Sequence, residues 1–142
     1  MIEGFVLHER LAQDTVAVAD LGLSALLLMQ ERRWPWLILV PRRAGVSEIA
    51  DLVPADRALL VEEIAAATRL LQALYRPDKV NVAAIGNLVP QLHLHVVARY
   101  RNDPVWPKPI WGQLPPEPYE KTALDDRLAE LRHALTQARH RH

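Results

Sequence analysis

Residues 91–97 read QLHLHVV, and this alternation of polar and apolar side chains limits the fold more than any other stretch of the chain. Successive side chains of a strand point to opposite faces, so the alternation predicts a strand whose leucines and valine enter a core. The side chains of Gln91, His93 and His95 would emerge together on the other face, about 6.6 Å from one to the next. We expect this strand to run from Gln91 to Tyr100 and to be the longest of the chain.

Four shorter stretches are also predicted as strands, at residues 15–20, 25–29, 36–40 and 79–84. The polar insert at residues 30–33 has the length of a hairpin connection, which favours antiparallel neighbours. Gly86 and Asn87 supply the turn before the strand that starts at Gln91, so these two strands form a second hairpin. The sequence therefore predicts an antiparallel sheet of about five strands.

One long helix is predicted between Pro54, which suits a first helical turn, and Pro77, which stops the helix. Its apolar residues recur three and four positions apart and so form one core-facing stripe. They are Leu60, Ile64, Ala67, Leu71 and Leu74.

A proline-rich segment at residues 104–118 is predicted to be an extended arm, because its six prolines remove backbone donors and cannot continue a helix. Trp106 and Trp111 are expected to hold this arm in place. A C-terminal helix is predicted at about residues 122–139, with Thr122 as its N-cap. The elements add up to an α+β fold in a single domain, residues 1–142, with a core at about residues 15–112.

Composition excludes several classes of protein. The chain has 142 residues with 17 basic and 17 acidic side chains, so it lacks the basic excess of a nucleic-acid binder. The longest apolar run, residues 34–41, is far too short for a membrane span, and Glu3 stands where a signal peptide would be basic. We therefore expect a cytoplasmic protein with neither a nucleic-acid nor a membrane partner.

The residue types that are missing or rare exclude several kinds of catalytic and binding site. There is no cysteine, which removes thiolate metal sites, disulfides and cysteine nucleophiles. The two serines lie outside any glycine-flanked elbow, and the five glycines are too scattered for a phosphate-binding loop. Serine hydrolase, P-loop and dinucleotide-binding functions are thus all disfavoured.

His93 and His95 are the strongest candidates for catalysis. Imidazole titrates near neutral pH, so two histidines on one rigid strand can supply both a nucleophile and a proton donor. The alternative is that they are ordinary polar residues of a half-exposed strand. The polar row beside a glycine turn favours the functional interpretation.

At this point the sequence resembles a known family. Residues 87–97, NLVPQLHLHVV, are similar to the motif of the histidine-triad (HIT) family, His-apolar-His-apolar-His-apolar-apolar. Residues 34–43, WPWLILVPRR, resemble the family's proline-led strand that ends in proline and basic residues. Gly86 also lies seven residues before the middle histidine, where the family keeps a glycine. The resemblance covers about residues 15–112 and implies a HIT-like fold.

The resemblance implies hydrolysis or transfer of nucleotidyl groups. We expect no cofactor and no bound metal, because His93 and His95 offer two nitrogens and the strand supplies no carboxylate to complete a three-ligand site. His93 would attack the α-phosphorus of a phosphoramidate or phosphoanhydride nucleotide and form a nucleotidyl-histidine intermediate. The backbone carbonyl of Gln91 would fix the His93 tautomer. His95, with backbone amides near Gly86 and Asn87, would stabilise the charge of the transition state.

The sequence departs from the family at Gln91, which replaces the first histidine of the triad. Three more residues are candidates for nucleotide contact, each with an ordinary structural alternative. Glu31 lies near the family's ribose-binding acid or is a solvated hairpin charge. Asn81 resembles a ligand-contacting polar residue or is an outward-facing strand amide. Arg99 shares the face of His93 and could approach phosphate, although a solvated basic residue is the more frequent case.

Two other functions remain open. A nucleotide-binding module with impaired catalysis is compatible with Gln91, and a metal enzyme is less well supported because no carboxylate lies between His95 and Asp103. We also expect a homodimer, because the strand at residues 79–84 has little charge and would be a poor free edge. The base, the leaving group and the physiological substrate are not determined by the sequence.

Overall fold

The computed structural model describes the backbone of residues 4–140 and the side chains of residues 4–138. Five strands form one antiparallel sheet in the order β1-β2-β3-β5-β4. Their bounds are β1 Thr15–Asp20, β2 Ser24–Met29, β3 Trp36–Pro41, β4 Lys79–Ala83 and β5 Leu94–Arg99. The predicted α+β fold with a five-stranded antiparallel sheet is confirmed.

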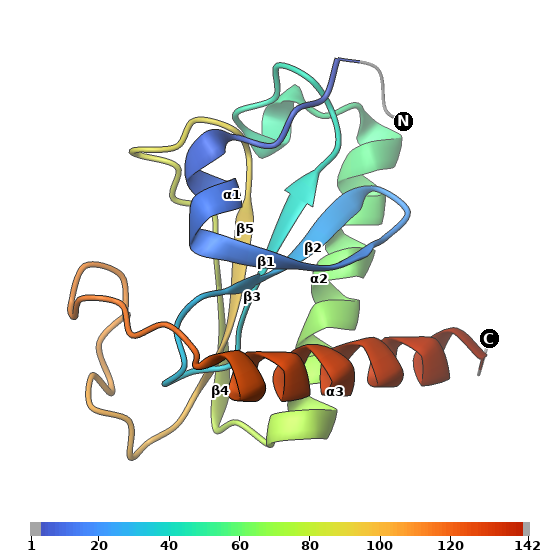
Figure 1. Ribbon diagram of the computed structural model, residues 1–142. Coiled ribbons are helices and arrows are strands. Elements are labelled where there is room, and N and C mark those ends of the chain that lie inside the picture. The colour runs from blue at the N-terminus through green and yellow to red at the C-terminus, as the bar shows by residue number, and fades with distance from the viewer. Residues whose placement is uncertain (1–3, 141–142) are drawn as a thin grey trace.

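The helices are α1 Glu9–Asp14, the 3₁₀ helix η1 Ile49–Asp51, α2 Pro54–Tyr75 and α3 Lys121–His140. Helix α2 packs along one face of the sheet, and α3 crosses near its C-terminal end and extends to β1 (Figure 1). The guanidinium of Arg132 on α3 donates to the carbonyls of Ala17 and Val18 at 2.8 and 3.0 Å, where the register of β1 shifts. Both predicted helices are therefore present, and α3 is fastened to the edge of the sheet.

The main core lies between the sheet and α2. Leu94 of β5 and Leu71 of α2 are both almost fully buried in it. Leu128 and Leu131 of α3 belong to the same cluster, so the C-terminal helix packs on the main core. Burial of the apolar side chains of this cluster is the main contribution that stabilises the fold.

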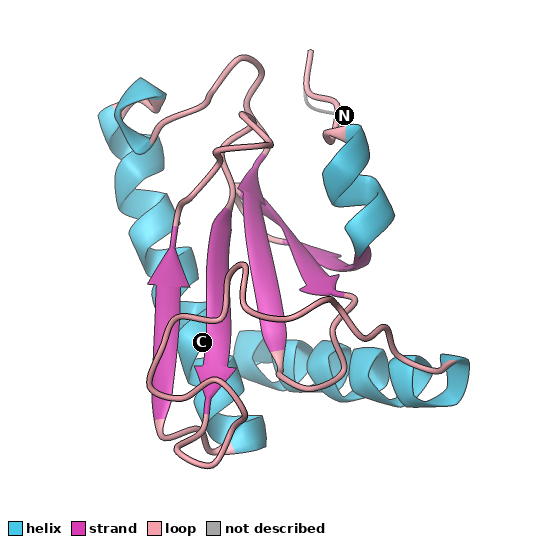
Figure 2. Ribbon diagram, turned by 90° about the vertical axis from the view of Figure 1, so that its left-hand side faces the viewer, coloured by secondary structure: helices cyan, strands magenta, loops and turns pink. Residues whose placement is uncertain are grey.

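The opposite face of the sheet is also buried, contrary to the polar face that the alternation predicts. Trp36 and Val97 form a second apolar cluster with Val105 and Ile110, which belong to the segment at residues 104–118. Figure 2 shows the loops of this segment crossing the sheet. Every residue of β5 is buried as a result. The polar face was a wrong prediction because alternation within one strand carries no information about a segment that covers it from elsewhere in the chain.

Strand β5 begins at Leu94, three residues later than predicted, and ends at Arg99. The pair Leu39–Leu94 closes the ladder between β3 and β5. Just before it, the N–H of Leu92 donates to the carbonyl of Val46 at 3.0 Å, so the backbone pairs with a loop instead of a strand. His93 therefore lies at the entrance of the strand and not within it.

Two helical features also differ from the predictions. Helix α3 starts at Lys121, so Thr122 lies in the first turn and is not the N-cap. The N–H of Leu124 donates to the carbonyl of Glu120 at 2.9 Å, as expected for that start. The short helix α1 was not predicted, because six residues with Leu11 as the one buried side chain give no periodic pattern. No helix of the described chain is both long and apolar enough to cross a membrane.

Candidate active site

The connection between β4 and β5, residues 84–93, carries a glycine turn and ends at His93. Gly86 has φ of 64°, a left-handed conformation that favours glycine, and a Cβ there would lie 3.3 Å from the carbonyl oxygen of Val89. The chain can therefore fold back tightly at this point. Gly86 and His93 consequently line the same cavity.

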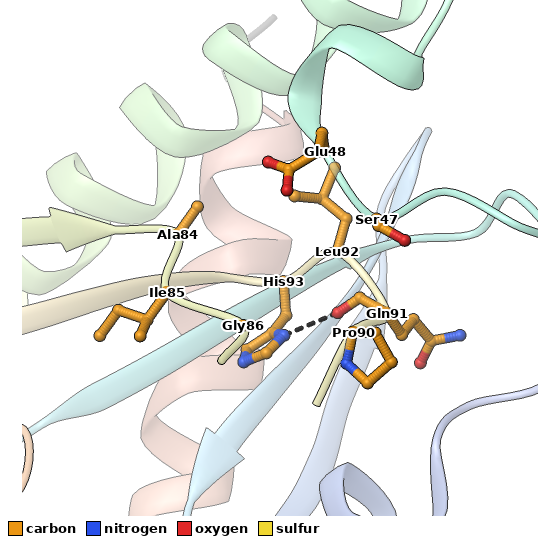
Figure 3. Close-up of a pocket in the computed structure, with 9 residues that line it drawn as sticks. All are labelled: Ser47, Glu48, Ala84, Ile85, Gly86, Pro90, Gln91, Leu92 and His93. Atoms are coloured by element: carbon orange, nitrogen blue, oxygen red, sulfur yellow. Dashed lines mark hydrogen bonds between the residues drawn. The ribbon is translucent and has the colours of Figure 1, made fainter. Parts of the chain in front are cut away.

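Two cavities meet at His93. The first has a volume of about 110 Å³ and is lined by the loop before η1, the glycine turn and the residues that lead into β5 (Figure 3). The second has a volume of about 160 Å³ and is mostly apolar. Its walls come from α1, from β2 and β3, and from Leu88 and Val89 of the turn, and both His93 and His95 contribute to it.

The ring of His93 is oriented by the backbone. Its Nδ1 lies 2.8 Å from the carbonyl oxygen of Gln91. Because a carbonyl can only accept a hydrogen bond, Nδ1 carries the proton and donates it. Nε2 of a neutral ring is then unprotonated, which is the state that a nucleophilic imidazole requires.

The side-chain amide of Gln91 makes a second set of contacts, with the segment that precedes α1. Its Oε1 accepts a hydrogen bond from the N–H of His8 at 2.8 Å, and its Nε2 donates to the carbonyl of Val6 at 2.8 Å. His8 in turn caps α1, since its Nδ1 accepts from the N–H of Arg10 at 3.0 Å. Gln91 thus contacts His93 through its backbone carbonyl and, through its side chain, the segment before α1, the helix that forms a wall of the second cavity.

The ring of His95 is enclosed by aromatic neighbours. The indole N–H of Trp36 donates to Nδ1 of His95 at 3.0 Å. Trp111 packs edge-on against the same imidazole with ring centroids 5.4 Å apart, and the centroids of His93 and His95 are 5.0 Å apart. Burial, together with the nearby His93, lowers the pKa of His95 from 6.5 to about 4. His95 is therefore a neutral imidazole at physiological pH.

The comparisons with known proteins agree with this geometry. Residues 10–102 match the HIT domain family. The chain belongs to the HIT family. No curated protein matches the sequence.

Solved HIT structures resemble the chain over nearly its whole length. A histidine triad protein from Marinobacter aquaeolei VT8 is 46% identical with a TM-score of 0.91, and the match covers 94% of this chain and 97% of that one. One from Bradyrhizobium japonicum is 42% identical with a TM-score of 0.89, covering 92% and 98%. One from Sinorhizobium meliloti 1021 is 40% identical with a TM-score of 0.91, covering 94% and 99%.

At the far end of β5 in this HIT domain, Arg99 is buried, and its guanidinium is paired with neighbouring side chains. It forms an ion pair with Asp103 at 2.9 Å and donates to Oδ1 of Asn81 at 3.0 Å. Burial opposes ionisation of Asp103, but hydrogen bonds from Arg99 and from backbone N–H groups outweigh it and hold the pKa of that carboxyl well below its usual range. The solvated state expected for Arg99 was therefore wrong.

Arg99 and Asn81 hydrogen-bond to each other further along the sheet than the histidines. Arg99 is six residues from His93, or about 20 Å along an extended chain. Asn81 pairs with Val97, four residues from His93. The predicted contact of these two residues with a nucleotide stays a prediction.

Glu31 lies in the turn between β2 and β3 and is buried rather than solvated. Its carboxylate accepts from the guanidinium of Arg33 at 2.6 Å and from the N–H of Glu117 at 3.3 Å. Burial opposes its ionisation, yet the hydrogen bonds from Arg33 lower the pKa of Glu31 overall. These contacts fasten the end of the proline-rich segment to the sheet, and the predicted nucleotide contact of Glu31 stays a prediction.

Sequence reasoning missed two parts of this candidate site. Trp36 was read only as part of a family-like strand, although its position before an apolar run could equally place it in a core. Helix α1 contributes Arg10, Leu11 and Asp14 to the second cavity, and nothing in its sequence indicates that role. Asn87, in contrast, is exposed on the glycine turn where the motif predicts it.

Proposed function

We propose that this HIT domain hydrolyses or transfers nucleotidyl groups through a covalent nucleotidyl-His93 intermediate. The observation that carries the proposal is the 2.8 Å contact between Nδ1 of His93 and the carbonyl of Gln91, beside two cavities. It leaves the lone pair of Nε2 free to react. Membership of the HIT family, which is associated with nucleotide binding and hydrolysis, supports the same conclusion.

The reaction has two displacement steps at phosphorus. In the first, the lone pair of His93 Nε2 forms a bond to the α-phosphorus, and the bond from phosphorus to the leaving group breaks. The leaving group keeps the electron pair and takes a proton from solvent. In the second, water attacks phosphorus with loss of a proton, the phosphorus–nitrogen bond breaks, and His93 is regenerated.

The surrounding groups have distinct roles in this proposal. His95 contributes an N–H to the phosphate oxygens, where negative charge grows in the transition state, and backbone amides at Gly86 and Asn87 assist it. The mostly apolar second cavity suits one face of a nucleoside, because flat, weakly polar groups bind in such cavities. The reacting phosphate would then lie between His93 and His95. No cofactor is needed for either step.

The test is to trap the intermediate. The enzyme is mixed with an adenosine phosphoramidate or a dinucleoside polyphosphate, quenched in base and digested, and the peptides are weighed by mass spectrometry. The mass of a nucleotidyl group should appear on His93, be released by acid and be absent from the His93→Ala variant. The variant His133→Ala, which removes an exposed histidine of α3, serves as the matched control and should label normally. A label on any other residue contradicts the proposal.

A second candidate function, a nucleotide-binding module without turnover, is favoured by Gln91 at the first motif position. Both functions predict that nucleotides raise the melting temperature. They differ in product formation, which the binding module lacks. A metal enzyme would instead lose activity to a chelator and regain it with zinc or manganese.

The proposal includes a homodimer. Strand β4 lies at the edge of the sheet, and its Val82 is 46% exposed. Unpaired edges of low charge tend to be covered by another strand or subunit. Sedimentation at micromolar concentration should give twice the chain mass of 16.1 kDa. A species of 16.1 kDa alone would exclude the dimer.

A further inference from the structure

The contact between Trp36 and His95 restricts where His95 can hold its proton. Trp36 lies in β3, and its indole N–H reaches Nδ1 of His95 across the sheet at 3.0 Å. Both side chains are more than nine-tenths buried. The hydrogen bond between them is therefore largely shielded from bulk water.

An indole N–H can only donate. Nδ1 of His95 must consequently present a lone pair, and the single proton of the neutral ring is on Nε2. A doubly protonated ring would place an N–H against the indole N–H in a buried site, which costs the hydrogen bond and leaves two donors without acceptors. The contact therefore disfavours both the other tautomer and the cationic ring.

We propose that Trp36 is a positioning residue that holds His95 as a neutral imidazole with its proton on Nε2, so that His95 donates a hydrogen bond to substrate phosphate and does not act as a cationic acid. This inference rests on the proposed function for the identity of the substrate. The tautomer of His95 itself follows from its contact with Trp36 and does not depend on the substrate.

The other groups around His95 do not oppose this state. His93, at a centroid distance of 5.0 Å, is the neighbouring titratable ring. Trp111 covers the imidazole and has no charge. Arg10 and Asp14 of α1 line the same cavity but pair with each other at 3.0 Å on an exposed surface. On the strands beside β5, His95 pairs with Ile38 and Ala83, which are both apolar.

The two histidines are thus held in opposite tautomers by opposite kinds of partner. The carbonyl of Gln91 accepts a hydrogen bond from Nδ1 of His93, so the ring proton is on Nδ1 and Nε2 keeps its lone pair. The indole N–H of Trp36 donates to Nδ1 of His95, so Nδ1 is unprotonated and the ring proton is on Nε2. A lone pair at one Nε2 and an N–H at the other are thus obtained from the same residue type, two positions apart.

Nuclear magnetic resonance of protein labelled with ¹⁵N in histidine and tryptophan tests the inference on the intact chain. At pH 7, Nδ1 of His95 should resonate as an unprotonated ring nitrogen and Nε2 as a protonated one, with the reverse assignment for His93. A scalar coupling between Trp36 Nε1 and His95 Nδ1 should be visible through the hydrogen bond. Observation of Nδ1–H on His95 in the wild type would overturn the inference, and this measurement needs no variant to fold.

The variant Trp36→Phe removes the donor and retains an aromatic ring. We expect the coupling to vanish, the Nδ1–H tautomer to become populated, and the pKa of His95 to rise by about one pH unit, the shift that a single hydrogen bond corresponds to. The matched control is Trp111→Phe, because the indole N–H of Trp111 has no hydrogen-bond partner among the described residues. The control should keep both the coupling and the wild-type tautomer. A Trp36→Phe protein with the wild-type tautomer and pKa would overturn the inference.

Kinetics separate the inference from the proposed function. With a nucleotide that the wild type turns over, Trp36→Phe should lower kcat roughly tenfold to a hundredfold, because the donor is no longer fixed in place, and should change KM by less than a factor of about three. An equal kcat in the variant would overturn the role in positioning. If no nucleotide is turned over while the tautomers are as stated, the proposed function fails and the proton state of His95 stands.

Discussion

The polar row that starts just before β5 and ends at Arg99 looks alike in sequence at its two ends, but these ends behave differently in the structure. At one end, His93 and His95 each use one ring nitrogen in a hydrogen bond and line a cavity with the rest of the ring. At the other end, Arg99 is committed to Asp103 and Asn81 and is 1% exposed. We infer that a candidate polar residue is better judged by the hydrogen-bonding capacity it leaves unused than by its position in an alternating pattern.

The largest effect is expected from His93→Ala. Removal of the nucleophile closes the covalent route, so turnover should fall by several powers of ten. The measurement is kcat/KM with the best nucleotide substrate, alongside the melting temperature as a control of folding. Near-normal turnover would place the chemistry elsewhere and remove the distinction between the two ends of the polar row.

Arg99→Leu tests the opposite end. Removal of one partner from a buried ion pair leaves Asp103 uncompensated, so the free energy of unfolding should fall by about 3–5 kcal/mol. Lys121→Leu is the matched control, because Lys121 and Asp125 form an ion pair with the same spacing on an exposed surface, and it should produce no measurable change. Denaturant unfolding gives both values. An unchanged KM in the folded variant would exclude a nucleotide contact of Arg99.

His95→Ala should reduce kcat roughly 10²- to 10³-fold, or about 2.7–4 kcal/mol of barrier, because one donor to the transition state is lost. Its effect should lie below that of His93→Ala and above that of Gln91→Ala. If His95→Ala were the more damaging of the two histidine variants, the roles of nucleophile and donor would have to be exchanged.

Stability should also depend on pH differently at the two ends. His95 has a folded-state pKa of about 4 against 6.5 for the free side chain, so the unfolded state binds the extra proton first. The free energy of unfolding should therefore fall by up to about 3 kcal/mol as pH decreases from 6.5 to 4. The lowered pKa of Asp103 acts below pH 3.8, where its stabilising contribution is lost as the carboxylate is protonated.

Denaturant unfolding at pH 7, 5.5 and 4 measures the first of these windows. In His95→Gln the slope between pH 6.5 and 4 should become shallower, and in His133→Gln, which alters an exposed histidine, it should not change. Equal slopes in all three proteins would show that His95 titrates normally.

Gln91→Ala should have the smallest effect on turnover, because the carbonyl that orients His93 remains. The variant loses two hydrogen bonds to the segment before α1, so that wall of the second cavity should loosen. We expect KM to rise a few-fold with kcat within about a factor of three. A fall in kcat without a change in KM in Gln91→Ala would instead point to a direct catalytic role of Gln91. The variant Gln91→His restores the full triad pattern of the family and tests whether an imidazole can substitute for the amide.

The sequence was sufficient for the sheet and the long helix, because periodicity is a local property. Its motif singled out His93 as a candidate, but the alternation placed this residue within a strand, and β5 starts only at Leu94. The sequence was not sufficient for the burial of His95 and Arg99, because their cover comes from residues 104–118 and their partners from other elements. Trp36 illustrates the limit most clearly. Its importance arises from the register that sets β3 beside β5, and no local pattern encodes which side chains face each other across two strands.

The indoles of Trp36 and Trp111 lie beside His95, so their fluorescence can report on what binds there. Trp36 and Trp111 have their ring centroids 5.7 and 5.4 Å from the imidazole. Indole emission depends on polarity and on contact with neighbouring groups, so a nucleotide that enters beside His95 should change the intrinsic fluorescence. Binding and turnover could then be followed in real time on unlabelled protein, with Trp36→Phe and Trp111→Phe to assign the signal.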